Sequence, residues 1–393
     1  MEKNGGDALN TGDHTLIKNI NRQIILEKII ETGSISRAQL SKVTGLNKAT
    51  ITSQIAVLLN DRIVIETTFD KSTGGRKPIL LSLNTRAAYA IGIDVDREHI
   101  HFLLTDLEGN VITKQCMGMD TTSFESTKKV LKEKIQSLID STPCSAYGVV
   151  GIGIGIHGMV DKNEKITFAT HSKWKNVDLK DYLRTAFNIP VFIDNNTNFC
   201  TYAEKTFYVN DSNLVCLTTS TGIGLGIVID NVLYKGLHGF AGEIGHMIIE
   251  ADGKQCGCGS KGCWELYASE KAFLENLSAE KNLETCSLRE VKQWIGQKDA
   301  VTLELLKKLS KYLSIGINNI INIFNPETII INSQLISMYP EMIRRIESEL
   351  SSGMNDYKRI LYSKLCKDAC VLGACAIVIK HFLNISDLKL MKE

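Results

Sequence analysis

The stretch YAIGIDVDREHIHFLLTDLEGNVI, residues 89–112, decides the fold. It contains two runs of apolar and β-branched residues on either side of a short charged turn, and a third run, KQCMGM, follows. Runs of this length and composition predict consecutive β-strands. A helix pattern, STKKVLKEKIQSLIDS, comes next, and then two more strand-like runs, YGVVGIGIGI and VFID, which each end in a polar or glycine-rich turn.

This order of elements is that of one lobe of an actin-like ATPase fold, and the second half of the chain repeats it. NLVCLTTSTGIGLGIVIDNVLYKG predicts two strands around a glycine turn, helices dominate from 264 to about 323, and ETIIINSQL predicts a late strand. Tight turns between strands explain any one of the glycines but not the whole set. We therefore predict a two-lobed α/β body over residues 85–393, with a cleft between the lobes.

Size and composition limit the class of protein. The chain has 393 residues, 44% of them hydrophobic, and a formal net charge of +1, as expected of a globular protein with two or three domains. No run of 18 apolar residues predicts a membrane span, and no apolar region near the start predicts a signal peptide. Residues 1–15 are predicted to be a flexible leader. The 11 cysteines are scattered and odd in number, which favours a cytoplasmic protein with buried thiols over a disulfide scaffold.

Residues 16–84 predict a separate N-terminal domain. Ser36 can cap a short helix, SRAQLSKVT, Gly45 can supply a left-handed turn residue, and Asn47 can cap a further helix, KATITSQIAVLL. Two helices joined by a glycine turn at this spacing are typical of a helix-turn-helix. The side chains predicted to point outward are mostly short and polar, as suits contacts with base edges in a major groove. They are Lys48, Thr50, Thr52, Ser53 and Gln54.

Two β-branched runs, IVIETT and ILLSL, flank DKSTGGRKP and predict a hairpin with a basic tip, so that the domain is a winged helix-turn-helix. A helical protein-interaction domain with a charged loop is the alternative, but a basic hairpin at this distance favours DNA binding. Up to Leu83 the chain has 11 Lys and Arg against 8 Asp and Glu, so we expect binding to depend on placement and dimerisation rather than on charge. The predicted DNA-binding set also includes Ser36, Arg37 and Asn47 at the helix starts and Gly74, Gly75, Arg76 and Lys77 at the hairpin tip, where they would meet phosphates or the minor groove.

A cysteine cluster predicts a metal site. His246, Cys256, Cys258 and Cys263 follow one another in GEIGHMIIEADGKQCGCGSKGCWE. One imidazole and three thiolates complete a tetrahedral zinc site with no position left for water, so we predict one structural zinc per chain. Reduced thiols in a glycine-rich loop are the alternative. The site is not a DNA-reading finger, because no helix follows at finger spacing.

These segments together resemble the ROK family, which is named for repressors, open reading frames and kinases. The resemblance covers nearly the whole chain, and the cysteine pattern preceded by G-E-x-G-H is its most specific part. Within the family, STGIGLGIVIDNVLYKG, GCWELYASEKA and HSKWKNVDL look most like the xylose-operon repressors of Gram-positive bacteria. The other matching segments are SRAQLSKVTGLNKATI, STGGRKP, GIGIHGMVD and IDNNTNFCTYAE.

The resemblance implies a sugar site. In the family, the sugar is held by an Asn-Asp pair, by the Glu and His of E-x-G-H, and by an acidic residue after the last zinc cysteine. The family's catalytic base is the Asp of the pair, and the matching residue here is Asn196, whose amide cannot take a proton at neutral pH. Trp174 either gives this site an apolar face or belongs to the core. The residues that match the sugar ligands are Asn195, Asn196, Glu243, His246 and Glu265.

Two further departures concern the phosphates of ATP. Family kinases carry D-x-G-G-T-K at the first strand turn, whereas IDVDREH keeps Asp94 but adds Asp96 and Glu98, and like charges repel. The late nucleotide turn is also altered and reads INSQL, although the glycine turn STGIGLG remains. We therefore predict no catalytic residues and no enzyme activity.

The resemblance implies a repressor that binds double-stranded operator DNA as a homodimer or a dimer of dimers and is released by a free sugar, with xylose expected. A sugar kinase with an added N-terminal domain is the alternative. Loss of a general base costs ~10²–10⁴-fold in rate, which favours the repressor. A sugar-blind repressor controlled by a partner protein is a third possibility, and the conserved type of the sugar-binding side chains argues against it.

Overall fold

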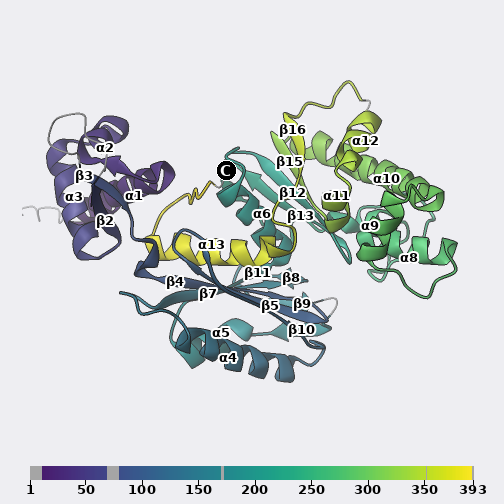
Figure 1. Cartoon of the computed structure of the whole chain (residues 1–393), viewed down its shortest axis with the longest axis horizontal. Helices are drawn as coiled ribbons and strands as arrows, with labels where there is room; N and C mark the ends of the chain where they lie inside the picture. The colour runs from purple at the N-terminus through teal and green to yellow at the C-terminus, as the bar shows by residue number, and fades with distance from the viewer. Residues whose placement is uncertain (1–10, 69–78, 170–171, 351, 392–393) are drawn as a thin grey trace, which may run out of the picture.

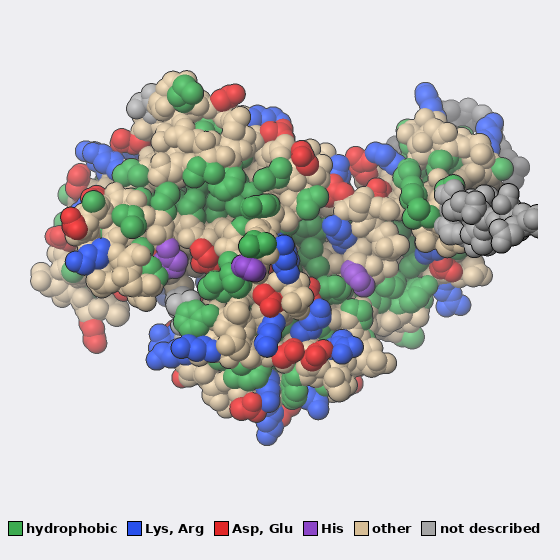
Figure 2. All heavy atoms as spheres, turned by 180° about the vertical axis from the view of Figure 1, so that it is seen from behind, with side chains coloured by type: hydrophobic (Ala, Val, Ile, Leu, Met, Phe, Trp, Pro, Cys, Tyr) green, Lys and Arg blue, Asp and Glu red, His purple; other side chains and the backbone are tan. Residues whose placement is uncertain are grey.

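The computed structural model describes residues 11–68, 79–169, 172–350 and 352–391, which form an N-terminal module beside a body of two lobes (Figure 1). Each lobe contains one five-stranded sheet. On the face shown in Figure 2, acidic and basic side chains are interspersed over both lobes, in keeping with the net charge of +1. Among the described helices, none combines the length and apolar character needed to cross a membrane.

The N-terminal module consists of three helices and a small antiparallel sheet with strand order β1-β3-β2. Hydrophobic side chains of all three helices pack with those of the sheet in one core. The elements in chain order are α1 (Thr11–Thr32), β1 (Ile35–Ser36), α2 (Arg37–Thr44), α3 (Lys48–Asn60), β2 (Val64–Thr68) and β3 (Ile79–Leu83).

The short helices of the module start and stop at the predicted residues. Ser36 caps α2 by accepting a hydrogen bond from the Gln39 backbone N–H, and Gly45 ends α2 in the left-handed conformation with φ of 71°. Asn47 caps α3 in the same way. The predicted boundary at residue 16 needs correction, because α1 begins at Thr11 and no proline interrupts the chain between the two positions. Residues 1–10 of the predicted leader lie outside the described part of the chain.

The first lobe is built on a sheet with strand order β11-β7-β4-β5-β6. Strands β4, β5 and β6 are consecutive and antiparallel, whereas β7 and β11 run parallel to β4. Helices α4 and α5 lie on one side of this sheet and α13 lies on the other (Figure 1). The bounds are β4 (Tyr89–Val95), β5 (His99–Asp106), β6 (Val111–Gly118), α4 (Phe124–Asp140), β7 (Val149–Ile156), α5 (Leu179–Phe187), β11 (Val191–Asn195) and α13 (Ala369–Leu383), with the short η1 (Thr85–Ala87) and η3 (Cys366–Asp368).

The second lobe repeats this arrangement with strand order β14-β13-β12-β15-β16. Three consecutive antiparallel strands are again followed by two parallel ones, so the predicted repetition is confirmed. The strands are β12 (Leu214–Thr219), β13 (Ile223–Ile229), β14 (Val232–Leu233), β15 (Thr328–Asn332) and β16 (Arg359–Tyr362). The helices are η2 (Ile244–His246), α7 (Glu265–Ala268), α8 (Glu270–Glu280), α9 (Leu288–Gly296), α10 (Ala300–Phe324), α11 (Gln334–Met338) and α12 (Glu341–Glu349).

A third, three-stranded sheet accompanies the first lobe and settles the role of Trp174. It consists of β8 (Met159–Val160), β9 (Ile166–Ala169) and β10 (Trp174–Val177). Trp174 is 3% exposed in the hydrophobic core, and its Nε1 donates to the Thr121 carbonyl at 2.9 Å. This side chain therefore belongs to the core.

Helix α6 (Asn196–Phe207) joins the two lobes. It packs on α13 of the first lobe and on β12 and β13 of the second. All 12 of its residues are buried, including the polar ones. A helix without an exposed side is a core element, so α6 is shared by both lobes.

Candidate functional site

A cavity of about 370 Å³ lies between the lobes, lined both by the turn at the carboxyl end of β11 and by the glycine turn between β12 and β13. This volume is typical of small-molecule sites. The five residues that the resemblance assigned to sugar binding come from separate segments of the chain, and all of them line this one cavity: Asn195, Asn196, Glu243, His246 and Glu265.

The amides of this cavity are held by hydrogen bonds before any ligand arrives. The Asn195 Oδ1 atom accepts from the Thr197 backbone N–H at 2.8 Å and caps α6, and its Nδ2 atom donates to the Gly158 carbonyl at 2.8 Å. Asn196 is the first residue of α6 and is buried. Each group of the Asn195 amide can still form one further hydrogen bond, so a ligand hydroxyl can bind without disturbing the turn.

Asp194 fixes the same turn to the second lobe. Its Oδ1 atom accepts from the Asn195 backbone N–H and from Asn198 Nδ2, both at 2.8 Å. Its Oδ2 atom pairs with Lys235 Nζ at 2.6 Å, and the Asp194 side chain is 8% exposed. A buried carboxylate needs such partners, so Asp194 and the third amide, Asn198, serve to position the turn.

The opposite wall of the cavity carries two carboxylates and an imidazole. Glu243 precedes η2, and His246 ends it. Glu265 opens α7, and its Oε1 atom lies 3.4 Å from His246 Nδ1. Carboxylates accept hydrogen bonds from hydroxyl groups, which complements the amides on the other wall.

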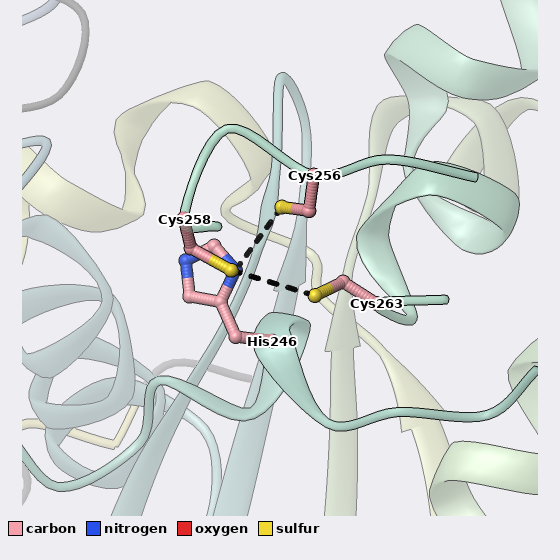
Figure 3. Close-up of side chains that lie close together, drawn as sticks. All are labelled: His246, Cys256, Cys258 and Cys263. Carbon is pink, nitrogen blue, oxygen red and sulfur yellow. Dashed lines mark hydrogen bonds between the residues drawn. The ribbon is translucent and has the colours of Figure 1, made fainter. Parts of the chain in front are cut away.

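The four predicted metal ligands converge beside this wall (Figure 3). The ligand atoms of His246, Cys256, Cys258 and Cys263 all lie within 4.8 Å of one another. Cys258 Sγ is 3.6 Å from Cys263 Sγ, and Cys256 Sγ is 3.7 Å from His246 Nδ1. A tetrahedral zinc with bonds of about 2.3 Å to sulfur separates its sulfur ligands by roughly 3.8 Å, so the cluster is compatible with structural zinc.

His246 belongs to both the cluster and the cavity. Its Nδ1 atom faces Cys256 Sγ, and the residue also lines the cavity. A metal bound to Nδ1 would fix the tautomer and the direction of the ring, which leaves Nε2 for a ligand. The Glu265 carboxylate, 3.4 Å from Cys256 Sγ, likewise touches the cluster.

A second cavity of about 210 Å³ shares His157 and Asn196 with the first and is lined by carboxylates. Asp94, Asp96 and Glu270 contribute them. Glu98, which was also expected to oppose phosphates, is exposed on the turn that follows. Because phosphates are anionic, this lining is unfavourable to a nucleotide.

His157 neutralises part of this charge. Its Nε2 atom lies 3.1 Å from Asp94 Oδ1, and its Nδ1 atom lies 3.9 Å from Asp96 Oδ1. Burial disfavours the charged imidazole, but the attraction of Asp94 outweighs it and raises the pKa of His157 to about 9. At neutral pH an ion pair therefore stands at the end of β4, where family kinases carry a phosphate-binding turn.

The module presents some, but not all, of the predicted DNA-binding residues to solvent. Lys48, Thr52 and Ser53 of α3 are exposed, and Thr50 is half-buried. Gln54 was predicted to point outward but is 9% exposed. It lies on the inward face of α3 because positions i, i+3, i+4 and i+7 of a helix share one side, and these are Ile51, Gln54, Ile55 and Leu58.

The remaining candidates in the module have structural partners or lie outside the described residues. The side chains of Ser36 and Asn47 cap their helices. Arg37 pairs with Glu66 Oε1 at 2.6 Å across the module. Gly74, Gly75, Arg76 and Lys77 at the hairpin tip fall outside the part of the chain that the structure describes.

Comparisons with known proteins identify relatives of the whole chain. The model of the ROK family matches residues 90–381. The xylose repressor of Bacillus spizizenii is 42% identical over 384 residues, which cover 96% of this chain and 99% of that protein. The structure of a ROK family transcriptional regulator, a homologue of the E. coli MLC protein, has a TM-score of 0.78 and 28% identity over 93% of this chain and 96% of that one. A ROK family glucokinase from Streptomyces griseus, solved with glucose and AMPPNP, has a TM-score of 0.67 and 24% identity, with 98% of its chain matching 74% of this one; this likeness shows the fold.

Proposed function

Since the chain belongs to the ROK family, we propose that it is a sugar-responsive transcriptional repressor that binds operator DNA and is released by a free sugar, with xylose as the inducer. One observation carries the proposal: the cavity keeps a complete set of sugar-binding side chains, while Asn196 stands at the position of the catalytic base. The xylose repressor at 42% identity supports xylose as the sugar.

In this proposal the sugar is held by hydrogen bonds alone. The amides of Asn195 and Asn196 can donate to and accept from hydroxyl groups, and the carboxylates of Glu243 and Glu265 can accept from them. His246 contributes Nε2. Zinc bound to its Nδ1 atom would fix the direction of the ring and supply no reaction step, so one structural zinc per chain is part of the proposal.

DNA would be read by the N-terminal module acting as a winged helix-turn-helix. The exposed side chains of α3, Lys48, Thr52 and Ser53, would enter the major groove. A homodimer, or a dimer of dimers, would place two such helices on the half-sites of a palindromic operator. The sugar would weaken binding by as much as it prefers the arrangement of the modules that does not fit the operator.

A sugar kinase with an added domain is the second candidate, and the glycine turn between β12 and β13 is the observation in its favour. This turn, Ser220 to Gly224, lines the first cavity. The Asp94–His157 ion pair and the amide of Asn196 argue against phosphoryl transfer, since one occupies the phosphate position and the other cannot act as a base.

The test is an electrophoretic shift assay with DNA selected by the protein from a random-sequence library. Free xylose is expected to release the DNA at lower concentration than glucose or N-acetylglucosamine. Ser53→Ala is expected to weaken the selected sequence over random DNA, with about 1–3 kcal/mol lost per base contact. Failure to select any sequence, or release by none of the sugars, would contradict the proposal.

A further inference from the structure

Helix α6 runs from the sugar cavity to the side of the body that meets the N-terminal module. Asn195 caps its first turn and Asn196 begins it, and both line the cavity. Lys205 and Phe207 lie in its last turn. Nine residues of helix separate Asn196 from Lys205, a distance of about 14 Å. The two ends of one helix therefore lie at two different sites.

Close backbone contacts hold α6 between the lobes as a stiff unit. A Cβ atom added at Gly226 of β13 would lie 1.8 Å from Thr201 Oγ1, and one added at Gly373 of α13 would lie 1.8 Å from the Phe199 carbonyl oxygen. Neither neighbour thus leaves space for α6 to bend locally. Packed elements of this kind move as units rather than deform, so a displacement at the cavity end reaches the far end.

The far end of α6 is fastened to the segment that follows α13. Lys205 Nζ lies 2.8 Å from Asp387 Oδ1 and 3.1 Å from Asp387 Oδ2, and the Lys205 side chain is 1% exposed. The Leu390 backbone N–H donates to the Thr206 carbonyl at 2.9 Å. A buried ammonium group is unfavourable without its partner, so the segment and the helix are held together.

The same segment is fastened to the first helix of the module. Glu27 Oε1 on α1 accepts from the Ser386 backbone N–H at 2.8 Å, from Ser386 Oγ at 2.7 Å and from the Asp387 backbone N–H at 3.3 Å. Ile385, Leu388 and Leu390 belong to the hydrophobic cluster that also contains the buried side chains of α1. The segment thus contacts the module and the body through adjacent residues.

Space for movement exists at this junction. A cavity of about 410 Å³ is lined by residues of α1, of β3 and of the first lobe, together with Leu390. A closely packed interface would leave no such volume. The module can therefore shift on the body without first breaking a filled core.

We propose that α6, the Lys205–Asp387 ion pair and the hydrogen bonds of Glu27 to residues 386 and 387 form the connection through which sugar binding changes DNA affinity. The inference rests on the proposed function. Sugar bound to Asn195 and Asn196 shifts α6, the ion pair transmits the shift to the segment after α13, and Glu27 transmits it to α1. Both sites act on one packed element, which is the requirement for a coupling free energy between them.

The experiment measures coupling separately from binding. Three quantities are determined: xylose affinity of the free protein, operator affinity without sugar, and the ratio of operator affinities without and with saturating xylose. In Lys205→Met/Asp387→Leu both charges are removed, so no buried charge is left unpaired. We expect the two affinities to stay within about threefold of wild type, while the ratio falls from the 5–150-fold typical of allosteric proteins to nearly one.

Two further variants keep the test decisive. Glu27→Ala leaves the buried ion pair intact and serves if the double variant does not fold; its ratio is also expected to fall. Lys114→Met/Asp368→Leu removes an exposed ion pair of 2.6 Å elsewhere in the first lobe and should keep the wild-type ratio. If wild type responds to xylose and the folded junction variants respond equally, the connection is wrong. If wild type responds to no sugar, the proposed function itself fails, and the connection fails with it.

Discussion

The two neighbouring cavities of the cleft differ in what they can bind. The first has amides, carboxylates and an imidazole directed at a space suited to a molecule rich in hydroxyl groups. The second, which shares His157 and Asn196 with it, is lined by carboxylates and contains a buried ion pair. The difference shows that ligand binding and phosphoryl transfer are separable in this fold, because a few side chains on one side can change while the other side keeps its set.

Removing the metal is expected to have the largest effect, and it is confined to the first cavity. Zinc binding contributes on the order of 10 kcal/mol to the folding of small zinc domains, and here the ligands hold His246 at the cavity wall. Cys258→Ser should therefore lower the melting temperature and abolish xylose binding. Metal analysis, thermal unfolding and calorimetric titration measure these effects.

Cys144→Ser is the matched control, since Cys144 is exposed and lies outside the metal cluster. It should retain one zinc per chain and normal xylose binding. Metal-free protein that binds xylose with unchanged affinity would separate the cluster from the cavity.

The ion pair of the second cavity is expected to have the next largest effect, through pH. The pKa of His157 is raised from 6.5 to about 9, so its stabilisation is complete below pH 6.5 and is lost as the pH rises through 9. The charged groups facing the ring are Asp94 and Asp96. The loss amounts to at most about 3 kcal/mol in the free energy of unfolding.

Urea unfolding of wild type and His157→Gln at pH 6 and pH 9.5 measures this term by difference. Wild type should lose more stability than the variant over this range. Equal losses in the two proteins would mean that the pair contributes nothing to stability.

A single carboxylate of the first cavity is expected to have a smaller effect. Glu243→Gln removes the charge that strengthens a hydrogen bond to a sugar hydroxyl, which is worth about 1.5–3 kcal/mol, or roughly 10- to 150-fold in xylose affinity. Operator affinity without sugar should not change, so the variant should remain on DNA at sugar concentrations that release wild type. Calorimetry and shift assays test this, with the exposed Glu280→Gln as control.

Restoring the base alone is expected to have no effect on catalysis. Asn196→Asp supplies a carboxylate to the first cavity, but the second cavity still opposes phosphates. An ATP-coupled assay with xylose or glucose should stay at background. Turnover of ~1 s⁻¹, within the usual range of enzymes, would show that the second cavity accepts ATP after all.

Local patterns made the metal cluster and the helix caps predictable from the sequence. The four metal ligands lie within 18 residues of chain, and Ser36, Gly45 and Asn47 act on their own helices. The position of Gln54 was predictable too, because the periodicity of Ile51, Ile55 and Leu58 places it inward; its polar character suggested the wrong face.

The contacts between distant segments could not be predicted in this way. His157 and Asp94 are separated by 63 positions, and Lys205 and Asp387 by 182. Neither pair has a local signature, since only the packing of complete elements brings the charges together. The sugar-binding side chains are also distant from one another, and they were found through family resemblance rather than from physical pattern.

The double use of Asn195 has a consequence for protein engineering. This one side chain lines the cavity and caps α6. Replacing it to recognise another sugar would alter the helix and, with it, the response of the switch. A biosensor library is better directed at cavity residues that do not belong to α6, such as Lys254 and Leu266, where selectivity can change while the output is preserved.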